Sequence, residues 1–278
     1  MSTGLRGVTV RQGGSTLLHD VDLDLAPGTL TAVFGGDGAG KTTLLRSLVG
    51  LLAPVSGEVD VPPPGRLGYA GAAGGVYPDL TVEENLRFAA AAYRLPRELL
   101  GPRIAELLEV TALAAARTRR AAHLSGGMRR KLGFACATIH DPTLLVLDEP
   151  TTGVDPISRA ELWRLVARTI AGGTTAVFSS TYVDEAVRAD HVLVLDRGRV
   201  LTSGPPETVR RGVAGHVVRL DGVTSEAPSW RRGRFRHAWI APGAKRPAGA
   251  APIEPDLEDA VIVAALAASA TRLPERVR

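Results

Sequence analysis

The segment with the clearest chemical signature is the glycine-rich stretch at residues 35–43, which fits the pattern G-x-x-x-x-G-K-[ST]. An apolar run precedes it, and leucines at helical spacing follow it. At such a strand-to-helix turn, backbone N–H groups can surround phosphate oxygens at the positive end of a helix. The alternative is an ordinary glycine-rich turn, but one of only three lysines in the chain occupies the required position. We therefore predict a nucleotide-binding loop formed by Gly35, Gly36, Asp37, Gly38, Ala39, Gly40, Lys41, Thr42 and Thr43.

Two acidic residues further along the chain complete the expected site. Asp148 and Glu149 follow an apolar run that is typical of a strand buried on both faces. Lys41 is expected to bridge the terminal phosphates of a nucleotide, while Thr42 and Asp148 hold Mg²⁺, Asp148 through the water shell of the ion. Glu149 is the candidate to polarise the water that attacks the terminal phosphate. The alternative is a capped strand end, and the phosphate loop upstream favours the catalytic interpretation.

The elements that must position these residues alternate between apolar runs and helical patterns, which predicts an α/β fold with a parallel sheet. Period-two alternation at residues 21–25 predicts an antiparallel region ahead of the phosphate loop. Residues 66–78 are rich in glycine and alanine and are expected to form a loop. A helical insert, interrupted by Pro96 and Pro102, is expected at about residues 80–140.

Length and composition divide the chain into a main domain at residues 1–211 and a small C-terminal extension at 212–278. The extension is expected to contain a strand, a loop rich in proline and arginine at about 224–252, and a short helix at about 256–268. No signal peptide is visible, and the longest apolar run near an end is about half of what a bilayer crossing requires. The single cysteine, Cys136, is expected to be a buried apolar residue rather than a reactive thiol. These features predict a cytoplasmic protein.

Positive charge is concentrated in arginine clusters, although the net charge is only +4. The clusters allow three interpretations: nucleic-acid binding, a solvated face, or contact with anionic lipid headgroups beside a membrane partner. Aromatic residues are too few and too scattered to form a stacking platform for nucleic-acid bases. Direct binding of nucleic acid is therefore not expected.

Three further motifs resemble those of ATP-binding cassette (ABC) ATPases. Residues 124–128, Leu-Ser-Gly-Gly-Met, resemble the signature motif of that family, which normally ends in glutamine where this chain has Met128. Residues 148–156 look like the Walker B and D-loop segments, and residues 77–86 are also characteristic. The resemblance covers about residues 5–210 and is greatest to daunorubicin-type export ATPases, especially the first half of proteins with two cassettes in tandem.

The resemblance implies a P-loop NTPase fold with a RecA-like parallel core, an N-terminal antiparallel β subdomain and an inserted α-helical subdomain. It also implies a head-to-tail dimer in which ATP and Mg²⁺ lie between the phosphate loop of one cassette and the signature motif of the other. The implied contacts on the partner's nucleotide are Ser125, Gly126, Gly127 and Met128, with Asp155 in the D-loop. The partner would be a second cassette, different or identical. Integral membrane permease subunits would hold the pair at the inner face of the membrane, where hydrolysis drives the export of drug-like or lipophilic substrates.

The chain departs from the family pattern at three positions. The glutamine expected in the loop that faces the metal and the permease falls at Ala72, and the histidine that contacts the γ-phosphate falls at Thr181. The aromatic residue that stacks on adenine falls near Arg11 or Gln12, and an arginine can stack in its place. We therefore expect the chain's own site to bind MgATP firmly and to hydrolyse it slowly.

Two functions from other classes are weighed against transport. The first is a non-transport cassette that acts on ribosomes or DNA. Such proteins usually carry either two cassettes joined by a charged linker or a long coiled coil, and this sequence contains neither. The second is a regulator that senses ATP without turning it over, which predicts that Glu149 has no importance for function.

Overall fold

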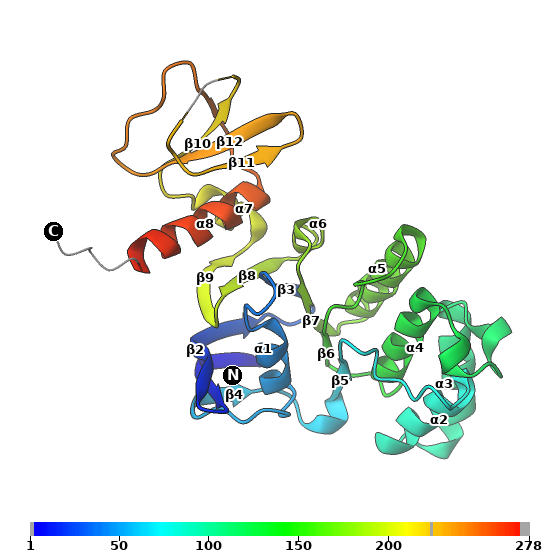
Figure 1. Cartoon of the computed structure of the whole chain (residues 1–278). Coiled ribbons are helices and arrows are strands. Elements are labelled where there is room, and N and C mark those ends of the chain that lie inside the picture. The colour runs from blue at the N-terminus through cyan, green and yellow to red at the C-terminus, as the bar shows by residue number, and fades with distance from the viewer. Residues whose placement is uncertain (1–2, 223–224, 273–278) are drawn as a thin grey trace.

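The computed structural model of the chain describes residues 3–222 and 225–272 (Figure 1). Its central sheet consists of β3 (Leu30–Phe34), β5 (Leu67–Ala70), β6 (Leu144–Leu147), β7 (Thr175–Ser180), β8 (His191–Asp196) and β9 (Arg199–Gly204). In the described residues the strand order is β5-β6-β7-β3-β8-β9. All neighbouring pairs are parallel except β8 and β9, which form the antiparallel edge of the sheet. The predicted α/β fold with a parallel sheet is confirmed.

Helices cover both faces of this sheet, which explains why its inner strands are continuous apolar runs. On β6, Leu145 and Leu147 belong to one apolar cluster, whereas Leu144 and Val146 belong to another on the opposite face. The helices around the sheet are α1 (Lys41–Leu48), α4 (Gly126–Thr138), α5 (Pro156–Ala171), α6 (Val183–Ala186) and α7 (Pro206–Arg211). Because α1 belongs to one cluster and α4 and α5 contribute to the other, these helices lie on opposite faces.

The N-terminal antiparallel sheet covers the face on which α1 packs. It consists of β1 (Thr3–Gln12), β2 (Ser15–Leu25) and β4 (Ser56–Asp60), in the order β2-β1-β4. Along the last part of β2, Val21, Leu23 and Leu25 are buried while Asp22 and Asp24 are exposed. The period-two pattern of the sequence therefore predicted the correct inward face.

The helical insert contains α2 (Val82–Ala92) and α3 (Arg97–Val110), and it extends from the side of the sheet opposite to α1 (Figure 1). Thr81 begins α2 with a capping box, in which the Thr81 hydroxyl accepts from the Glu84 N–H and the Glu84 carboxylate accepts from the Thr81 N–H. Pro96 precedes α3 as expected, but Pro102 lies inside α3 and does not interrupt it. The apolar contacts of Ile104, Leu107 and Leu108 in this helix outweigh the loss of one backbone hydrogen bond at Pro102. Short 3₁₀ helices occupy Pro64–Arg66, Ala114–Ala116 and Ala121–His123.

The prediction of a loop over residues 66–78 is wrong in its first part, because residues 67–70 form β5. This strand pairs with β6 in parallel, and Leu67 is buried. Gly68 made this strand look like a loop in the sequence, since glycine is rare in strands unless another backbone approaches closely. A Cβ atom on Gly68 would stand 2.1 Å from the carbonyl oxygen of Ala137, which belongs to α4.

The C-terminal residues form a sheet and a long helix, where the sequence predicted one strand, a loop and a short helix. The elements are β10 (His216–Leu220), β11 (Ser229–Arg232), β12 (Phe235–Ile240), β13 (Ala251–Ile253) and α8 (Leu257–Arg272). The strand at 216–220 and the helix expected at about 256–268 agree with the prediction, although the helix continues to residue 272, whereas the expected loop at 224–252 contains β11, β12 and most of β13. Apolar residues of the sheet pack on α8, where Val217 and Trp239 meet Val263. β11 and β12 carry arginines and a histidine without a regular alternation of polar and apolar residues, and this concealed the sheet.

Two other expectations concern single features of the chain. Cys136 is buried in α4 among residues of the helical insert, and burial raises the pKa of its thiol to about 12. The interpretation of Cys136 as a buried apolar residue is confirmed. Within residues 3–222 and 225–272, none of the helices combines the length and the apolar composition needed to cross a bilayer.

We predict that Gly68→Ala destabilises the protein by about 1–3 kcal/mol, because the new methyl group forces β5 and α4 apart. The free energy of unfolding in urea measures this loss. Gly65→Ala is the matched control, since a Cβ atom there would meet no atom within 4 Å. Equal stability of the two variants would contradict the close approach of β5 to α4.

Candidate nucleotide-binding site

The predicted phosphate loop and the acidic pair lie at one edge of the central sheet. The loop follows β3, Asp148 and Glu149 follow β6, and Ser179 and Ser180 end β7, which lies between those two strands. In a parallel sheet the carboxyl ends of all strands meet at the same edge. The fold therefore brings together side chains that are separated by more than a hundred residues along the chain.

Glycine makes the phosphate loop possible at its bends. Gly38 and Gly40 adopt left-handed backbone conformations, with φ angles of +74° and +106°. A Cβ atom on Gly35 would stand 2.4 Å from the carbonyl oxygen of Leu195, so the loop begins in close contact with β8. Gly40 is the N-cap of α1, and no side chain caps the first N–H groups of this helix. Those free donors and the positive end of α1 are suited to binding an anion such as a phosphate group.

Lys41 crosses this loop from the first turn of α1. Its ammonium group donates to the carbonyl oxygens of Gly35 and Gly36 at 2.8 and 3.0 Å. The nearest carboxylate is Glu149, at 3.9 Å. The side chain of Lys41 is only 4% exposed, and a buried charge with so little pairing is poised to gain from a phosphate in the loop.

The expected metal ligands meet on the other side of the loop. The Thr42 hydroxyl donates to Asp148 Oδ1 at 3.1 Å, and the Ser179 hydroxyl donates to the same oxygen at 2.6 Å. Asp148 is buried, and its second oxygen, Oδ2, has no hydrogen-bond partner in the described structure. An unsatisfied carboxylate oxygen is costly unless a ligand uses it. These residues therefore fit Mg²⁺ with its water shell, which needs oxygen acceptors at this position.

Glu149 lies beside Lys41 in a cleft of about 280 Å³, whose other lining residues are Leu17 and residues 37–43. Its backbone has a φ of +46°, which few residues other than glycine adopt, and its N–H donates to the Ser179 hydroxyl at 2.9 Å. A strained backbone at a buried strand end is common where a side chain must take one direction for function. The structure thus places Lys41, Thr42 and Glu149 around one cleft, and Asp148 is hydrogen-bonded to Thr42 at its border.

The signature motif is not part of this cleft. Ser125 is the N-cap of α4 and accepts from the N–H of Met128 at 3.2 Å, while Gly126 and Gly127 form the first turn. None of these residues lines the cleft described above, because α4 packs on the opposite face of the sheet from α1. The N-terminus of α4 is therefore a second group of backbone donors that the same chain does not place on its own phosphate loop.

Asp155 lies next to the signature motif and caps α5. Its carboxylate accepts from the N–H groups of Ile157 and Ser158 at 3.1 and 2.9 Å, and these bonds lower the pKa of the Asp155 carboxyl. A Cβ atom on Gly127 would stand 2.3 Å from the Ser158 hydroxyl oxygen. The second glycine of the signature motif is thus required for contact with the start of α5.

The positions that depart from the family pattern are visible in the structure. Ala72 lies exposed in the loop after β5, and Thr181 follows β7 directly. The Arg11 guanidinium makes a long hydrogen bond of 3.5 Å to the Gly14 carbonyl, and Arg11 does not line the cleft. Leu17 of β2 does line it, so the β2 residue at this cleft is apolar.

Sequence reasoning missed two polar residues that organise the site. Ser179 binds both members of the acidic pair, as described above. Glu185 is fully buried and accepts hydrogen bonds from Thr151 after β6, Ser180 of β7 and Arg159 of α5. The available signal was a pair of serines at the end of an apolar strand, but a strand end is a common place for serine, so the pattern was not decisive.

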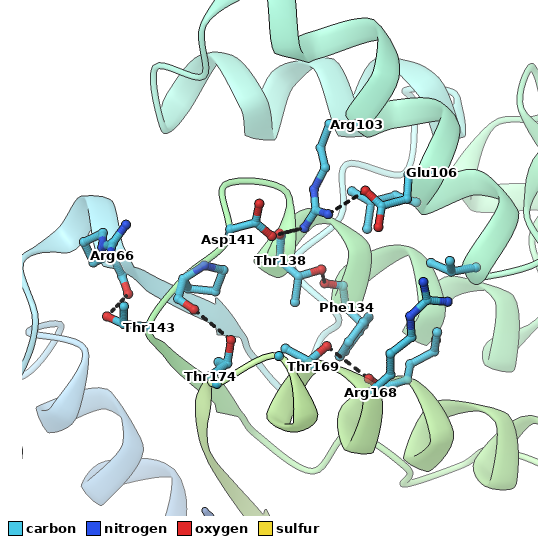
Figure 2. Close-up of a pocket in the computed structure, with 16 residues that line it drawn as sticks. Arg66, Arg103, Glu106, Phe134, Thr138, Asp141, Thr143, Arg168, Thr169 and Thr174 are labelled. Carbon is cyan, nitrogen blue, oxygen red and sulfur yellow. Dashed lines mark hydrogen bonds and ion pairs between the residues drawn. The ribbon is translucent and has the colours of Figure 1, made fainter. Parts of the chain in front are cut away.

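A second cavity, of about 420 Å³, lies at the opposite ends of the strands (Figure 2). It is bordered by Arg66, Arg103 and Arg168, but Arg103 is already paired with Glu106 and Asp141. Its threonine hydroxyls donate to backbone carbonyls, as Thr138, Thr143, Thr169 and Thr174 do. The C-termini of α4 and α5 also end here, and helix C-termini disfavour anions. This cavity therefore does not resemble a phosphate site.

Comparison with known proteins agrees with this geometry. The ABC transporter family profile matches residues 18–152. A probable multidrug ABC transporter ATP-binding protein of Escherichia coli is 41% identical over 205 residues, which is 70% of this chain and 36% of that protein. A daunorubicin resistance ATP-binding protein of Streptomyces coeruleorubidus is 37% identical over 232 residues, 80% of this chain and 73% of that protein. The chain thus spans about a third of the length of the first relative and about three quarters of the second.

Solved structures show the same fold. An ATP-binding subunit of an ABC transporter superposes with a TM-score of 0.70 at 28% identity, covering 76% of this chain and 92% of that one. A dimeric ATP-binding cassette in a post-hydrolysis state, bound to ADP and Pi, gives a TM-score of 0.66 at 23% identity over 73% of this chain and 97% of that one. The protein belongs to the family of ATP-binding proteins of ABC transporters. Its fold is that of a P-loop NTPase, as the sequence predicted.

We predict that Ser179→Ala lowers the free energy of unfolding by about 1–3 kcal/mol, because it removes a donor to Asp148 and the acceptor for the Glu149 N–H inside the protein. Urea denaturation measures the loss. Ser203→Ala is the control, since this exposed hydroxyl bonds only to His191 among the described contacts. If both variants matched the native protein, the buried hydrogen bonds of Ser179 would not matter for stability.

Proposed function

We propose that the chain is the ATP-binding and hydrolysing subunit of a membrane ABC transporter. The observation that supports this most directly is that Lys41, Thr42 and Glu149 line one cleft at the carboxyl edge of the sheet, with Asp148 hydrogen-bonded to Thr42. A triphosphate bound there would find backbone donors, a buried cation and the oxygen ligands that Mg²⁺ requires.

Each residue has a distinct role in this proposal. The N–H groups of residues 36–43 and the Lys41 ammonium group hold the β- and γ-phosphates. Thr42 and the free Oδ2 of Asp148 hold Mg²⁺, which supplies charge neutralisation when bound. Glu149 accepts a hydrogen bond from the attacking water and orients it toward the γ-phosphorus.

The signature motif serves a second cassette. Ser125, Gly126, Gly127 and Met128 open α4 at its positive end, and none of them lines the cleft of their own chain. In a head-to-tail dimer this helix end closes over the γ-phosphate on the partner, while Asp155 fixes the adjacent turn. ATP then holds the two cassettes together and hydrolysis releases them. The partner is a different cassette or a second copy of this chain.

Export of drug-like or lipophilic compounds is the transport function that we propose. The relatives described above are a probable multidrug transporter subunit and a daunorubicin resistance protein, and a third is a Nod factor export protein of Cupriavidus metallidurans, 36% identical over 230 residues. Integral membrane permease subunits would bind this chain at the cytoplasmic face of the membrane and form the path of the substrate across the bilayer.

The chain's own site is proposed to hydrolyse ATP slowly. Ala72 has no side chain able to reach the metal or the water, and the Thr181 hydroxyl cannot carry the charge that an imidazole would bring to the γ-phosphate. Loss of one positioned catalytic group costs about 10²–10⁴ in rate. These two positions also support a second candidate function, an ATP sensor without turnover, in which Glu149 would have no role.

We predict that Lys41→Ala weakens ATP binding by about 10–100-fold, because it removes the buried cation that faces the phosphates. Titration of the full chain with MgATP in a calorimeter measures the change. Lys245→Ala, an exposed lysine of the C-terminal loop, should bind like the native protein. If the native chain bound no ATP, the proposed function would be wrong.

We predict that the double substitution Ala72→Gln with Thr181→His raises the single-turnover hydrolysis rate by about 10–10²-fold, since it restores two catalytic positions. ATP affinity should change little, because the phosphate loop is untouched. The control is the same pair with Glu149→Gln, in which the gain should vanish. Fast hydrolysis by the native chain, abolished by Glu149→Gln alone, would contradict the slow-site proposal.

A further inference from the structure

The loop after β5, residues 71–76, lies directly against α4. A Cβ atom on Gly133 of α4 would stand 2.1 Å from the carbonyl oxygen of Gly74, and Gly74 itself is buried. Gly74 and Gly75 adopt left-handed conformations that allow the loop to follow the helix. The loop contains no polar side chain of its own, so any polar connection between it and the acidic pair must come from another element.

Arg130 of α4 makes such a connection. One end of its guanidinium group donates to the carbonyl oxygen of Ala72, and the other donates to the carbonyl oxygen of Thr152 at 3.3 Å. Ala72 follows β5 and Thr152 follows β6, so one planar side chain joins the segments after two neighbouring strands. The rigid fork of arginine suits two such acceptors, which a single ammonium group would not hold together in the same way.

The charge of Arg130 also acts on the acidic pair. Burial lowers the pKa of its guanidinium group, while the nearby carboxylates of Glu149 and Asp148 act in the opposite direction. Arg130 and Asp148 line the same small cavity, together with Gly71, Gly74 and other residues. Because arginine keeps its charge in proteins, a cation shares this cavity with Asp148 and lies within electrostatic range of Glu149.

We propose that Arg130 is a positioning residue. From α4 of the same chain, it holds loop 71–76 and the strand end at Asp148 and Glu149 in fixed positions relative to each other. Ala72 in the loop has no side chain that could connect the loop to this strand end, and Arg130 makes the connection instead. This inference rests on the proposed function and goes beyond it in assigning a role to Arg130. Arg129, the next residue, has no such role, because it is exposed and bonds weakly to Ala122 and Leu124 ahead of its own helix.

The position of Arg130 on α4 has a consequence for coupling between the two nucleotide sites of a dimer. Ser125 begins the same helix five residues earlier, where it would face the partner's ATP. A movement of α4 that follows the partner's nucleotide would therefore pull directly on the carbonyls of Ala72 and Thr152. The chain's own acidic pair would respond to the state of the other site through one side chain.

Hydrogen exchange of the full chain without nucleotide tests the positioning role. The segments to follow are residues 70–77 and 148–154, whose amides are held by bonds such as Asp148 N–H to Ala70 and Gly74 N–H to Gly71. Arg130→Ala should raise exchange in both segments by about tenfold, as expected for loss of a supporting contact. Arg130→Lys should give an intermediate increase, and Arg129→Ala should leave both segments unchanged.

Turnover supplies the second measurement. With MgATP and a complementary cassette, Arg130→Ala should lower the single-turnover rate of hydrolysis at the chain's own site about tenfold while changing ATP affinity less than about threefold. Adding Ala72→Gln to Arg130→Ala should restore part of the loss, because the new side chain can reach the same strand end. This rescue would not follow from a general loss of stability.

Three results would overturn the assignment of Arg130. They are unchanged exchange in Arg130→Ala, an increase spread evenly over α4 and the central sheet, and an equal effect of Arg129→Ala. Arg130→Lys decides the question if Arg130→Ala does not fold. Failure of the proposed function is distinguishable, because the exchange measurement uses no nucleotide, whereas a chain that binds no ATP fails only the turnover arm.

Discussion

The site depends on one buried oxygen atom, Oδ1 of Asp148, which accepts hydrogen bonds from two hydroxyl groups. Thr42 donates from α1 and Ser179 donates from β7, so the two bonds join the phosphate loop and two adjacent strands at a single point. Hydrogen bonds to a carboxylate are stronger than neutral ones, and burial makes them expensive to leave unmade. The pair fixes the direction of Asp148 and leaves its Oδ2 buried without a hydrogen-bond partner among the described residues.

Close backbone contacts at glycines hold the rest of the site around this point. Gly35 lies against β8, Gly127 against Ser158, and Gly133 against Gly74, each at a distance that leaves no room for a methyl group. These contacts place the phosphate loop, the signature helix and the loop after β5 with little freedom. Since packed interiors transmit displacement, a shift of α4 changes the surroundings of Asp148 and Glu149 without any need for a flexible linker.

The failures of sequence reasoning have physical causes at particular residues. Gly68 made β5 look like a loop, because its reason for being glycine is a contact with Ala137 that only the fold creates. In the C-terminal region, the arginines on β11 and β12 give these strands the composition that is typical of a solvated loop. Arg232 of β11 pairs with the carboxylates of Asp256 and Glu258 near the start of α8. These partners lie 24 and 26 residues further along the chain, so no local sequence pattern predicts them.

The sequence by itself determined the phosphate loop, the acidic pair, the alternation of strands and helices, and the family, because these depend on local spacing and residue type. Only the tertiary structure decided that Ser179 supports both acidic residues, that Leu17 lines the cleft, and that Arg130 reaches the carbonyl of Ala72. The reason is the same in each case: the partners lie on different elements. Their distances depend on how the sheet and α4 pack, which no local spacing or residue type reveals.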